Sequence, residues 1–98
     1  MKSSHLTVVA TIQARPGKEN EVREELLRLV APTQAEDGCF QYDLHESKSQ
    51  AGHFLFFENW TSAEALEKHL ATAHIARLKS KEEALLAKPV EITLWGKL

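Results

Sequence analysis

The sequence is poor in the residues that build covalent, metal or phosphate-binding frameworks. It contains one cysteine, Cys39, in 98 residues, so an intramolecular disulfide is excluded and no CxxC pair exists for zinc or redox chemistry. We interpret Cys39 as a small buried hydrophobic residue. Four scattered glycines exclude a phosphate loop and a dinucleotide fingerprint. The serines lie outside any nucleophile elbow, which leaves nucleophilic catalysis poorly supported.

Neither a dominant charge nor a long apolar run is present. Twelve basic and fourteen acidic residues give a formal net charge of −2, without the basic footprint of a nucleic-acid binder. No stretch is long and apolar enough to span a membrane, and Leu6–Ile12 is patterned as a strand and not as a signal peptide. We therefore expect a cytoplasmic protein that engages neither nucleic acid nor membrane.

The chain length predicts one domain over residues 1–98, with its core at about residues 6–95. Apolar residues make up 43% of the sequence, which is enough for one compact core. A domain of this size buries only about two-thirds of its unfolded surface. Pairing with a second copy would therefore add useful stability.

Hydrophobic periodicity predicts four strands and two helical segments. The strands are expected at Leu6–Ala14, Cys39–Ser47, His53–Trp60 and Val90–Trp95. In the second strand, alternation places Phe40, Tyr42 and Leu44 on one face.

The helical segments are marked by their apolar stripes and their ends. The first is predicted over Lys18–Ala31 and ended by Pro32. The second opens at a capping-box pattern, Thr61–Glu64, and continues to about Ala87. A change of direction near Ala71–Ala73, with Thr72 as a fresh cap, is compatible with the pattern, so one helix and two helices both stay open.

The order β-α-β-β-α-β is the ferredoxin-like arrangement, an α+β fold with a four-stranded antiparallel sheet. One layer of helices covers only one face of such a sheet. The strand His53–Trp60 is apolar on both faces, which indicates burial on both. We expect a homodimer through the sheet face, because a second copy of the chain is the simplest way to bury the face that the helices leave exposed.

Two histidines in the second helical segment could carry protons. His69 follows Leu66 by three positions, at the edge of the buried stripe, where it is either a proton carrier lining a pocket or a hydrogen-bonded boundary residue. His74 is either a second carrier or an exposed or capping residue. Five positions on a continuous helix separate the two by about 140° around the axis. We therefore expect no metal site from this pair unless the helix breaks between them.

The third strand brings polar groups into an apolar setting. Glu58 shares a face with Phe54, Phe56 and Trp60, so its carboxylate needs a partner or a raised pKa. It is either an acid/base group in a pocket or an end-of-strand residue that reaches solvent or an ion pair. Trp60 and Tyr42 are either pocket walls or core residues with satisfied polar atoms.

Four segments in this order resemble one family. The sequence resembles the antibiotic biosynthesis monooxygenase family, and within it the quinol monooxygenase-like branch. The segments are Arg15–Glu19 (RPGKE), Glu36–Tyr42 (EDGCFQY), Phe57–Trp60 (FENW) and Glu67–His74 (EKHLATAH).

The resemblance implies a ferredoxin-like subunit that pairs sheet to sheet in a dimeric α/β barrel, with a pocket between sheet and helices. It also implies oxidation of a quinol, polyphenol or similar aromatic small molecule by O₂, without a flavin, haem or metal cofactor. In that chemistry the deprotonated substrate itself reduces O₂, while the protein supplies a dry pocket, a proton acceptor and hydrogen bonds to the developing anion.

Site roles follow from the resemblance position by position. His69 and His74 would carry protons, and Glu58 or Asn59 would orient or deprotonate the substrate, although opposite strand faces keep these last two out of one pocket. The substrate-binding residues would be Trp60, Tyr42, Asn59 and Phe56. The alternatives are a non-catalytic small-molecule-binding or stress-response dimer of the same fold and a purely structural interaction module.

Overall fold

The computed structural model describes residues 5–98, so residues 1–4 of the expected domain lie outside the description. The elements follow the predicted order, with the second helical segment divided in two. They are β1 (Leu6–Gln13), α1 (Glu19–Gln34), β2 (Cys39–Glu46), β3 (His53–Trp60), α2 (Ala63–Leu70), α3 (Ala73–Leu85) and β4 (Glu91–Trp95).

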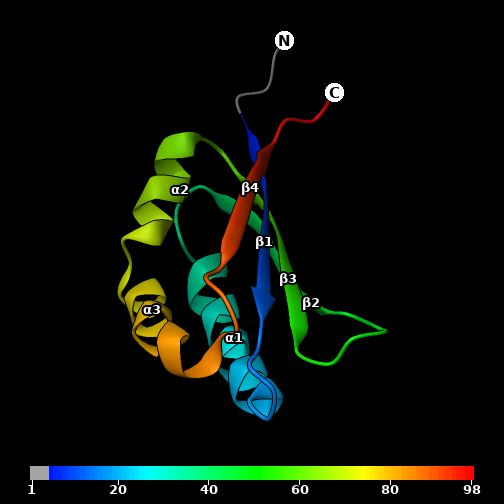
Figure 1. The fold of residues 1–98 in the computed structure, drawn as a ribbon. Helices are drawn as coiled ribbons and strands as arrows, with labels where there is room; N and C mark the ends of the chain where they lie inside the picture. The colour runs from blue at the N-terminus through cyan, green and yellow to red at the C-terminus, as the bar shows by residue number, and fades with distance from the viewer. Residues whose placement is uncertain (1–4) are drawn as a thin grey trace.

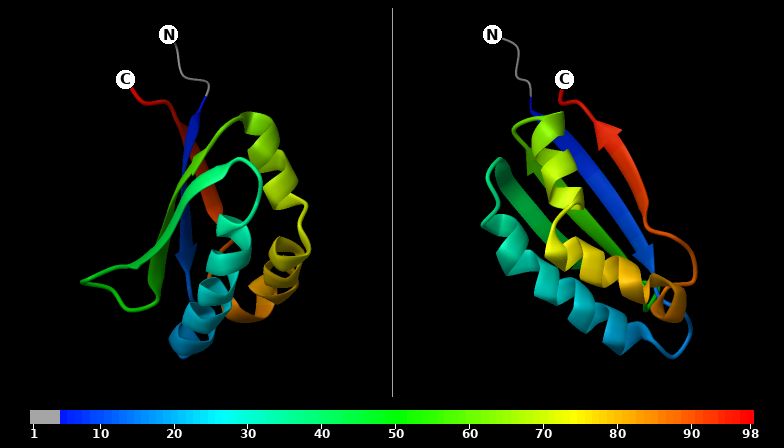
Figure 2. Two further views of the ribbon diagram at one scale, coloured as in Figure 1. Left: turned by 180° about the vertical axis from the view of Figure 1, so that it is seen from behind. Right: turned by 90° about the vertical axis from the view of Figure 1, so that its left-hand side faces the viewer.

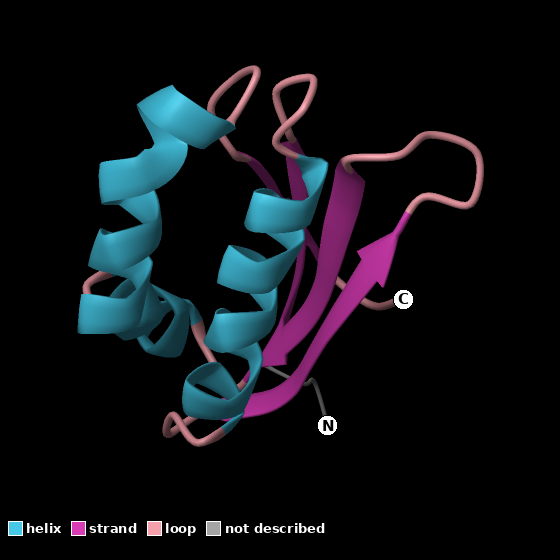
Figure 3. Ribbon diagram, turned by 90° about the horizontal axis from the view of Figure 1, so that it is seen from below, coloured by secondary structure: helices cyan, strands magenta, loops and turns pink. Residues whose placement is uncertain are grey.

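The strands form one antiparallel sheet in the order β2-β3-β1-β4. All three helices lie on one face of this sheet, which gives two layers (Figure 1 and Figure 3). The order and the single helix layer confirm the ferredoxin-like α+β prediction.

The core lies between the two layers and follows strand parity. Val8 and Ile12 of β1 and Phe54 and Phe56 of β3 point toward the helices and are almost fully buried. The helices meet them with their apolar stripes. The buried apolar helix residues are Val22, Leu26, Leu29, Ala65, Leu66, Ile75, Leu78 and Leu85.

The first helix is longer than predicted, because α1 continues through Pro32 to Gln34. Proline removes one hydrogen bond to the preceding turn, but its fixed φ is compatible with a helix, so the chain can continue beyond it. The amide of Ala35 reaches the carbonyl oxygen of Ala31 at 3.2 Å. Thr33 is fully buried in this added turn, which indicates that packing holds the helix past the proline.

The second helical segment is two helices, which settles the alternative that the sequence left open. Thr72 caps α3, and its side-chain oxygen accepts a hydrogen bond from the amide of Ile75 at 3.4 Å. The cap of α2 is Ser62, which accepts from the amide of Ala65 at 3.1 Å. The predicted capping box at Thr61 is therefore one residue too early.

A β-bulge corrects the predicted face of Phe40. The register of β2 against β3 shifts between Cys39 and Gln41, and a bulge of this kind leaves one residue unpaired and redirects its side chain. Phe40 is 57% exposed, and its ring makes a T-shaped contact with the His5 ring at a centroid distance of 5.0 Å. Cys39 is partly buried and packs against the core, so it is less buried than predicted.

In the described part of the chain, no helix covers the other face of the sheet (Figure 2). Leu55 and Phe57 of β3 lie on this outer face and are only partly buried in the single chain. Ile92 and Leu94, on the opposite side of the edge strand β4, are exposed as well. Within residues 5–98, no helix has the length and apolarity needed to cross a bilayer.

Candidate functional site

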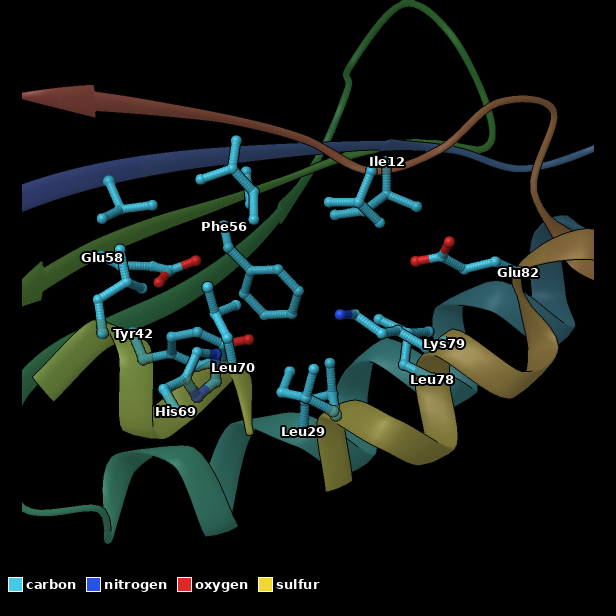
Figure 4. A pocket seen from close by; sticks show the side chains of 16 residues that line it. Ile12, Leu29, Tyr42, Phe56, Glu58, His69, Leu70, Leu78, Lys79 and Glu82 are labelled. Carbon is cyan, nitrogen blue, oxygen red and sulfur yellow. The ribbon is translucent and has the colours of Figure 1, made fainter. Parts of the chain in front are cut away.

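A pocket lies between the helix-facing side of the sheet and the helices, with a cavity of about 70 Å³. Most of its wall is apolar, and polar side chains gather at its two ends (Figure 4). The apolar wall includes Ala10, Leu29, Phe56, Leu66, Leu70 and Leu78.

One end of the pocket combines an acid, a phenol and an imidazole from three different elements. Glu58 comes from β3, Tyr42 from the neighbouring β2 and His69 from the last turn of α2. Tyr42 stands opposite Glu58 in the strand register, and its ring stacks on Phe56 with the centroids 4.4 Å apart. Strand parity and the helical stripe thus bring these predicted site residues together.

Trp60 lies directly behind this end and does not line the cavity. It is fully buried, and its ring centroid is 4.7 Å from that of His69. Its indole N–H donates a hydrogen bond of 2.8 Å to Oε1 of Glu58. Trp60 therefore fixes the carboxyl group and supports the imidazole from behind, and we do not place it on the substrate.

Glu58 is a buried carboxyl group with a neutral partner. Burial raises the pKa of Glu58 to about 7, and the hydrogen bond from Trp60 opposes that rise only in part. Both charge states of Glu58 are thus accessible near neutral pH. Burial also raises the pKa of the Tyr42 phenol, which keeps it protonated as a hydrogen-bond donor.

His69 is 2% exposed and is held by one polar contact. Its Nδ1 lies 2.9 Å from Oε2 of Glu36. Burial lowers the pKa of His69, and the Glu36 carboxylate works against that decrease. The Glu36 contact uses Nδ1, which leaves Nε2 as the nitrogen that can meet a molecule in the pocket.

Glu36 also holds the second histidine. Nε2 of His74 lies 2.6 Å from the same Oε2 atom, and the two imidazole centroids are 6.0 Å apart. The break between α2 and α3 makes this arrangement possible, because the two histidines would diverge on a continuous helix. Our sequence reasoning did not single out Glu36, since nothing local to the loop 35–38 shows that it meets two helices.

The cluster Glu36, His69 and His74 contains the donor types that transition metals use. One ligand-capable atom from each residue lies within 4.8 Å of the other two. The expectation of no metal site depended on an unbroken helix, so that reason no longer applies. In this structure both imidazoles are at hydrogen-bonding distance from a single carboxylate oxygen, which satisfies all three groups by hydrogen bonds.

Asn59 lies on the opposite face of the sheet from the pocket. Its side chain accepts a hydrogen bond of 2.6 Å from Thr7 and donates one of 2.6 Å to Gln41. The parity argument that separated it from Glu58 therefore holds, and Asn59 is not among the described residues that line the cavity.

The far end of the pocket carries two charged residues of α3, Lys79 and Glu82 (Figure 4). Our sequence reasoning did not assign either of them to a site. They are three apart on a helix whose mixed charges resemble a solvated face. Val90 and Ile92, from the chain that leads into and along β4, also line the pocket.

Comparisons with known proteins agree with this architecture. Residues 5–81 match the family model described as antibiotic biosynthesis monooxygenase. The structure of PA3566 from Pseudomonas aeruginosa aligns with a TM-score of 0.94 and 42% identity, covering 100% of this chain and 98% of that one. "Putative monooxygenase Rv0793" of Mycobacterium tuberculosis is 34% identical over 96 residues, 98% of this chain and 94% of that protein.

A more distant relative carries a substrate class in its name. "Probable quinol monooxygenase YgiN" of Escherichia coli is 27% identical over 99 residues, covering 91% of this chain and 92% of that protein. The fold and the matched residues define an α+β protein with a pocket under a single helix layer. The chain belongs to the antibiotic biosynthesis monooxygenase family.

Proposed function

We propose that this protein is a monooxygenase that oxidises a quinol or a similar electron-rich phenol with O₂ and needs no cofactor. The observation that carries the proposal is the polar end of the apolar pocket, where Glu58, His69 and Tyr42 converge. An apolar wall suits an aromatic ring, and the convergent polar groups suit its hydroxyl.

The charge states of His69, Tyr42 and Glu58 give each residue a different role in the proposed reaction. His69 is neutral near pH 7 because burial lowers its pKa, so its free Nε2 can accept the hydroxyl proton of a bound quinol. Tyr42 stays protonated and can donate a hydrogen bond to the phenolate that results. Glu58, with a pKa of about 7, can act as a second proton carrier.

The reaction balances for a quinol that has a ring C–H beside the hydroxylated carbon. The substrate gives four electrons to O₂, one oxygen atom is bonded to the ring carbon, and the other leaves as water with two hydrogens. The products are a hydroxyquinone and water. The proton that His69 takes from the substrate is returned to the reduced oxygen, so the enzyme ends each cycle in its starting state.

The cavity must widen to admit such a ring. Its volume of about 70 Å³ is below the roughly 300 Å³ at which small-molecule sites begin. Lys79 is exposed and Glu82 is partly exposed, so their side chains can swing away from the far end of the pocket more easily than the buried core residues can move. We propose this end as the route of entry.

Oxygen uptake tests the function. EDTA-treated protein is incubated with a panel of hydroquinones, including 1,4-naphthohydroquinone, and O₂ consumption is compared with the spontaneous rate. We expect protein-dependent uptake that falls at least tenfold in His69→Ala, given that a positioned acid or base contributes about 10²–10⁴-fold. The dimer content of the variant should equal that of wild type. An absence of protein-dependent uptake across the panel would instead favour a non-catalytic binding protein.

A further inference from the structure

The contacts of Glu36 define how the pocket histidine is protonated. A carboxylate oxygen only accepts hydrogen bonds, so a neutral His69 at 2.9 Å from it must carry its proton on Nδ1. The unprotonated nitrogen is then Nε2, the atom available to the pocket. Without Glu36, no described contact would favour this tautomer over the other.

Glu36 also acts on the charged form of His69. A buried imidazolium is costly, and the carboxylate beside Nδ1 offsets that cost when Nε2 takes a proton. His74 holds the same Oε2 from the solvent side, with its side chain 23% exposed against 15% for Glu36 and 3% for His69. The cluster thus runs from the pocket toward the surface.

We propose that Glu36 is a positioning residue: it fixes His69 in the Nδ1–H tautomer and stabilises the imidazolium that forms when His69 accepts a proton, while His74 holds Glu36 in place. Its catalytic consequence rests on the proposed function. The tautomer itself does not, because it follows from contacts within the free protein. The other ionisable groups near His69 are Glu58 and Tyr42.

Nitrogen NMR of ¹⁵N-histidine-labelled protein tests the tautomer without any substrate. His69 is assigned through the signal lost in His69→Gln. We expect the Nδ1–H tautomer in wild type near pH 7.5. In Glu36→Gln the side-chain carbonyl still accepts from Nδ1–H, so the tautomer is kept, but the pKa of His69 falls because the negative charge is gone. Glu36→Leu removes both effects, and the tautomer preference is lost.

Kinetics separate positioning from packing. With a quinol that wild type oxidises, we expect Glu36→Gln to lower kcat at least tenfold while KM changes less than about twofold, and to move the acid limb of the pH profile downward. Glu25→Gln is the matched control, since the Glu25 side chain is 13% exposed and pairs with Arg77 outside the pocket. This control should keep the kcat, the KM and the pH profile of wild type.

The outcomes are distinct. An Nε2–H tautomer in wild type, or an unchanged His69 titration in Glu36→Gln, would overturn the proposal. So would calorimetric binding of one zinc ion per chain to wild type but not to Glu36→Gln, because the ion would take the Nδ1 lone pair. If wild type consumes no O₂, the proposed function fails, and the NMR result alone decides the role of Glu36.

Discussion

Glu58 is a buried acid whose described hydrogen-bond partner is an uncharged indole. Water would solvate its charge far better than this pocket does, and the protein accepts that cost in a position that touches the cavity. Perturbed acids of this kind concentrate at functional sites, because a group near its pKa can both take and give a proton. A purely structural role would be served as well by glutamine, which can accept the same bond from Trp60.

Glu58→Gln should therefore stabilise the protein at high pH. The pKa of Glu58 is raised from 4.5 to about 7, so the folded state binds the proton more tightly and stability falls as pH rises from 4.5 through 7. At about 1.4 kcal/mol for each pKa unit, the wild type loses roughly 3 kcal/mol over that window through this group.

Urea denaturation of both proteins at pH 5 and pH 8 measures this effect. Subtracting the variant removes other titrating groups, His69 among them, from the comparison. The difference in unfolding free energy should favour the variant by roughly 2.5 kcal/mol more at pH 8 than at pH 5, because part of the effect is already lost at pH 5. Equal pH dependence in the two proteins would show that Glu58 is not perturbed.

Strand and helix periods predict which residues face the pocket, but not which residue orients them. Tyr42, Phe56 and Glu58 follow from alternation, and His69 follows from the stripe of α2. Glu36 could not be found this way, because it lies in a loop and its role depends on two helices meeting it in space. Periodicity also could not predict that Phe40 turns outward, because this depends on a β-bulge in the pairing of β2 with β3.

At the scale of elements, the loop 35–38 sets the distance between Glu36 and the helices. Gly38 adopts φ +85°, and a Cβ there would lie 2.6 Å from that of Ala65 and 2.8 Å from Oγ1 of Thr61. The carbonyl oxygen of Gly38 accepts a 2.8 Å hydrogen bond from the amide of Thr61. The loop is thus in close contact with the start of α2, the helix that carries His69.

Gly38→Ala should destabilise the protein more than Gly17→Ala, although both glycines have nearly the same positive φ, +85° and +86°. Each substitution carries a backbone cost of about 1–2 kcal/mol. Gly17 has nothing within 4 Å of the added Cβ, whereas Gly38 faces Ala65. Overpacking adds about 1–3 kcal/mol at Gly38 alone.

Urea denaturation at one protein concentration measures the unfolding free energy of each variant. The activity of each folded variant gives a second comparison. Only Gly38→Ala should also weaken the Glu36–His69 contact, seen as a change in the His69 nitrogen signals. Equal losses of stability in the two variants would mean that the loop does not pack closely on α2.

The helix boundaries show how far local sequence patterns can predict where an element begins and ends. The pattern predicted the second helical segment but left its break open, and the structure places the break at the cap that the sequence offered, Thr72. The predicted end of the first helix at Ala31 was wrong, because the buried Thr33 stabilises a further turn of α1 beyond Pro32. The cap at Thr72 is a local signal that the sequence contains. The turn after Pro32 depends instead on packing against residues distant in the sequence, which a local pattern does not show.

At the scale of the whole molecule, no helix of residues 5–98 covers the outer face of the sheet. Its apolar side chains include Leu55 and Phe57 on β3, with the bulged Phe40 and the exposed Trp95 near one end. A sheet of this kind normally packs against a second layer. We propose that a second copy of the chain supplies it, as the resemblance to dimeric α/β barrels implies.

Phe57→Glu tests this dimer, because the side chain lies on the outer face and not in the helix-covered core. We expect wild type to sediment as a dimer at micromolar concentration and the variant as a folded monomer, since a carboxylate buried at the interface is unpaired and costly. Leu27→Glu is the control: Leu27 is 55% exposed on α1, in the helix layer, so this change should leave the dimer intact. A monomeric wild type would contradict the proposal, and so would a Phe57→Glu dimer as stable as that of Leu27→Glu.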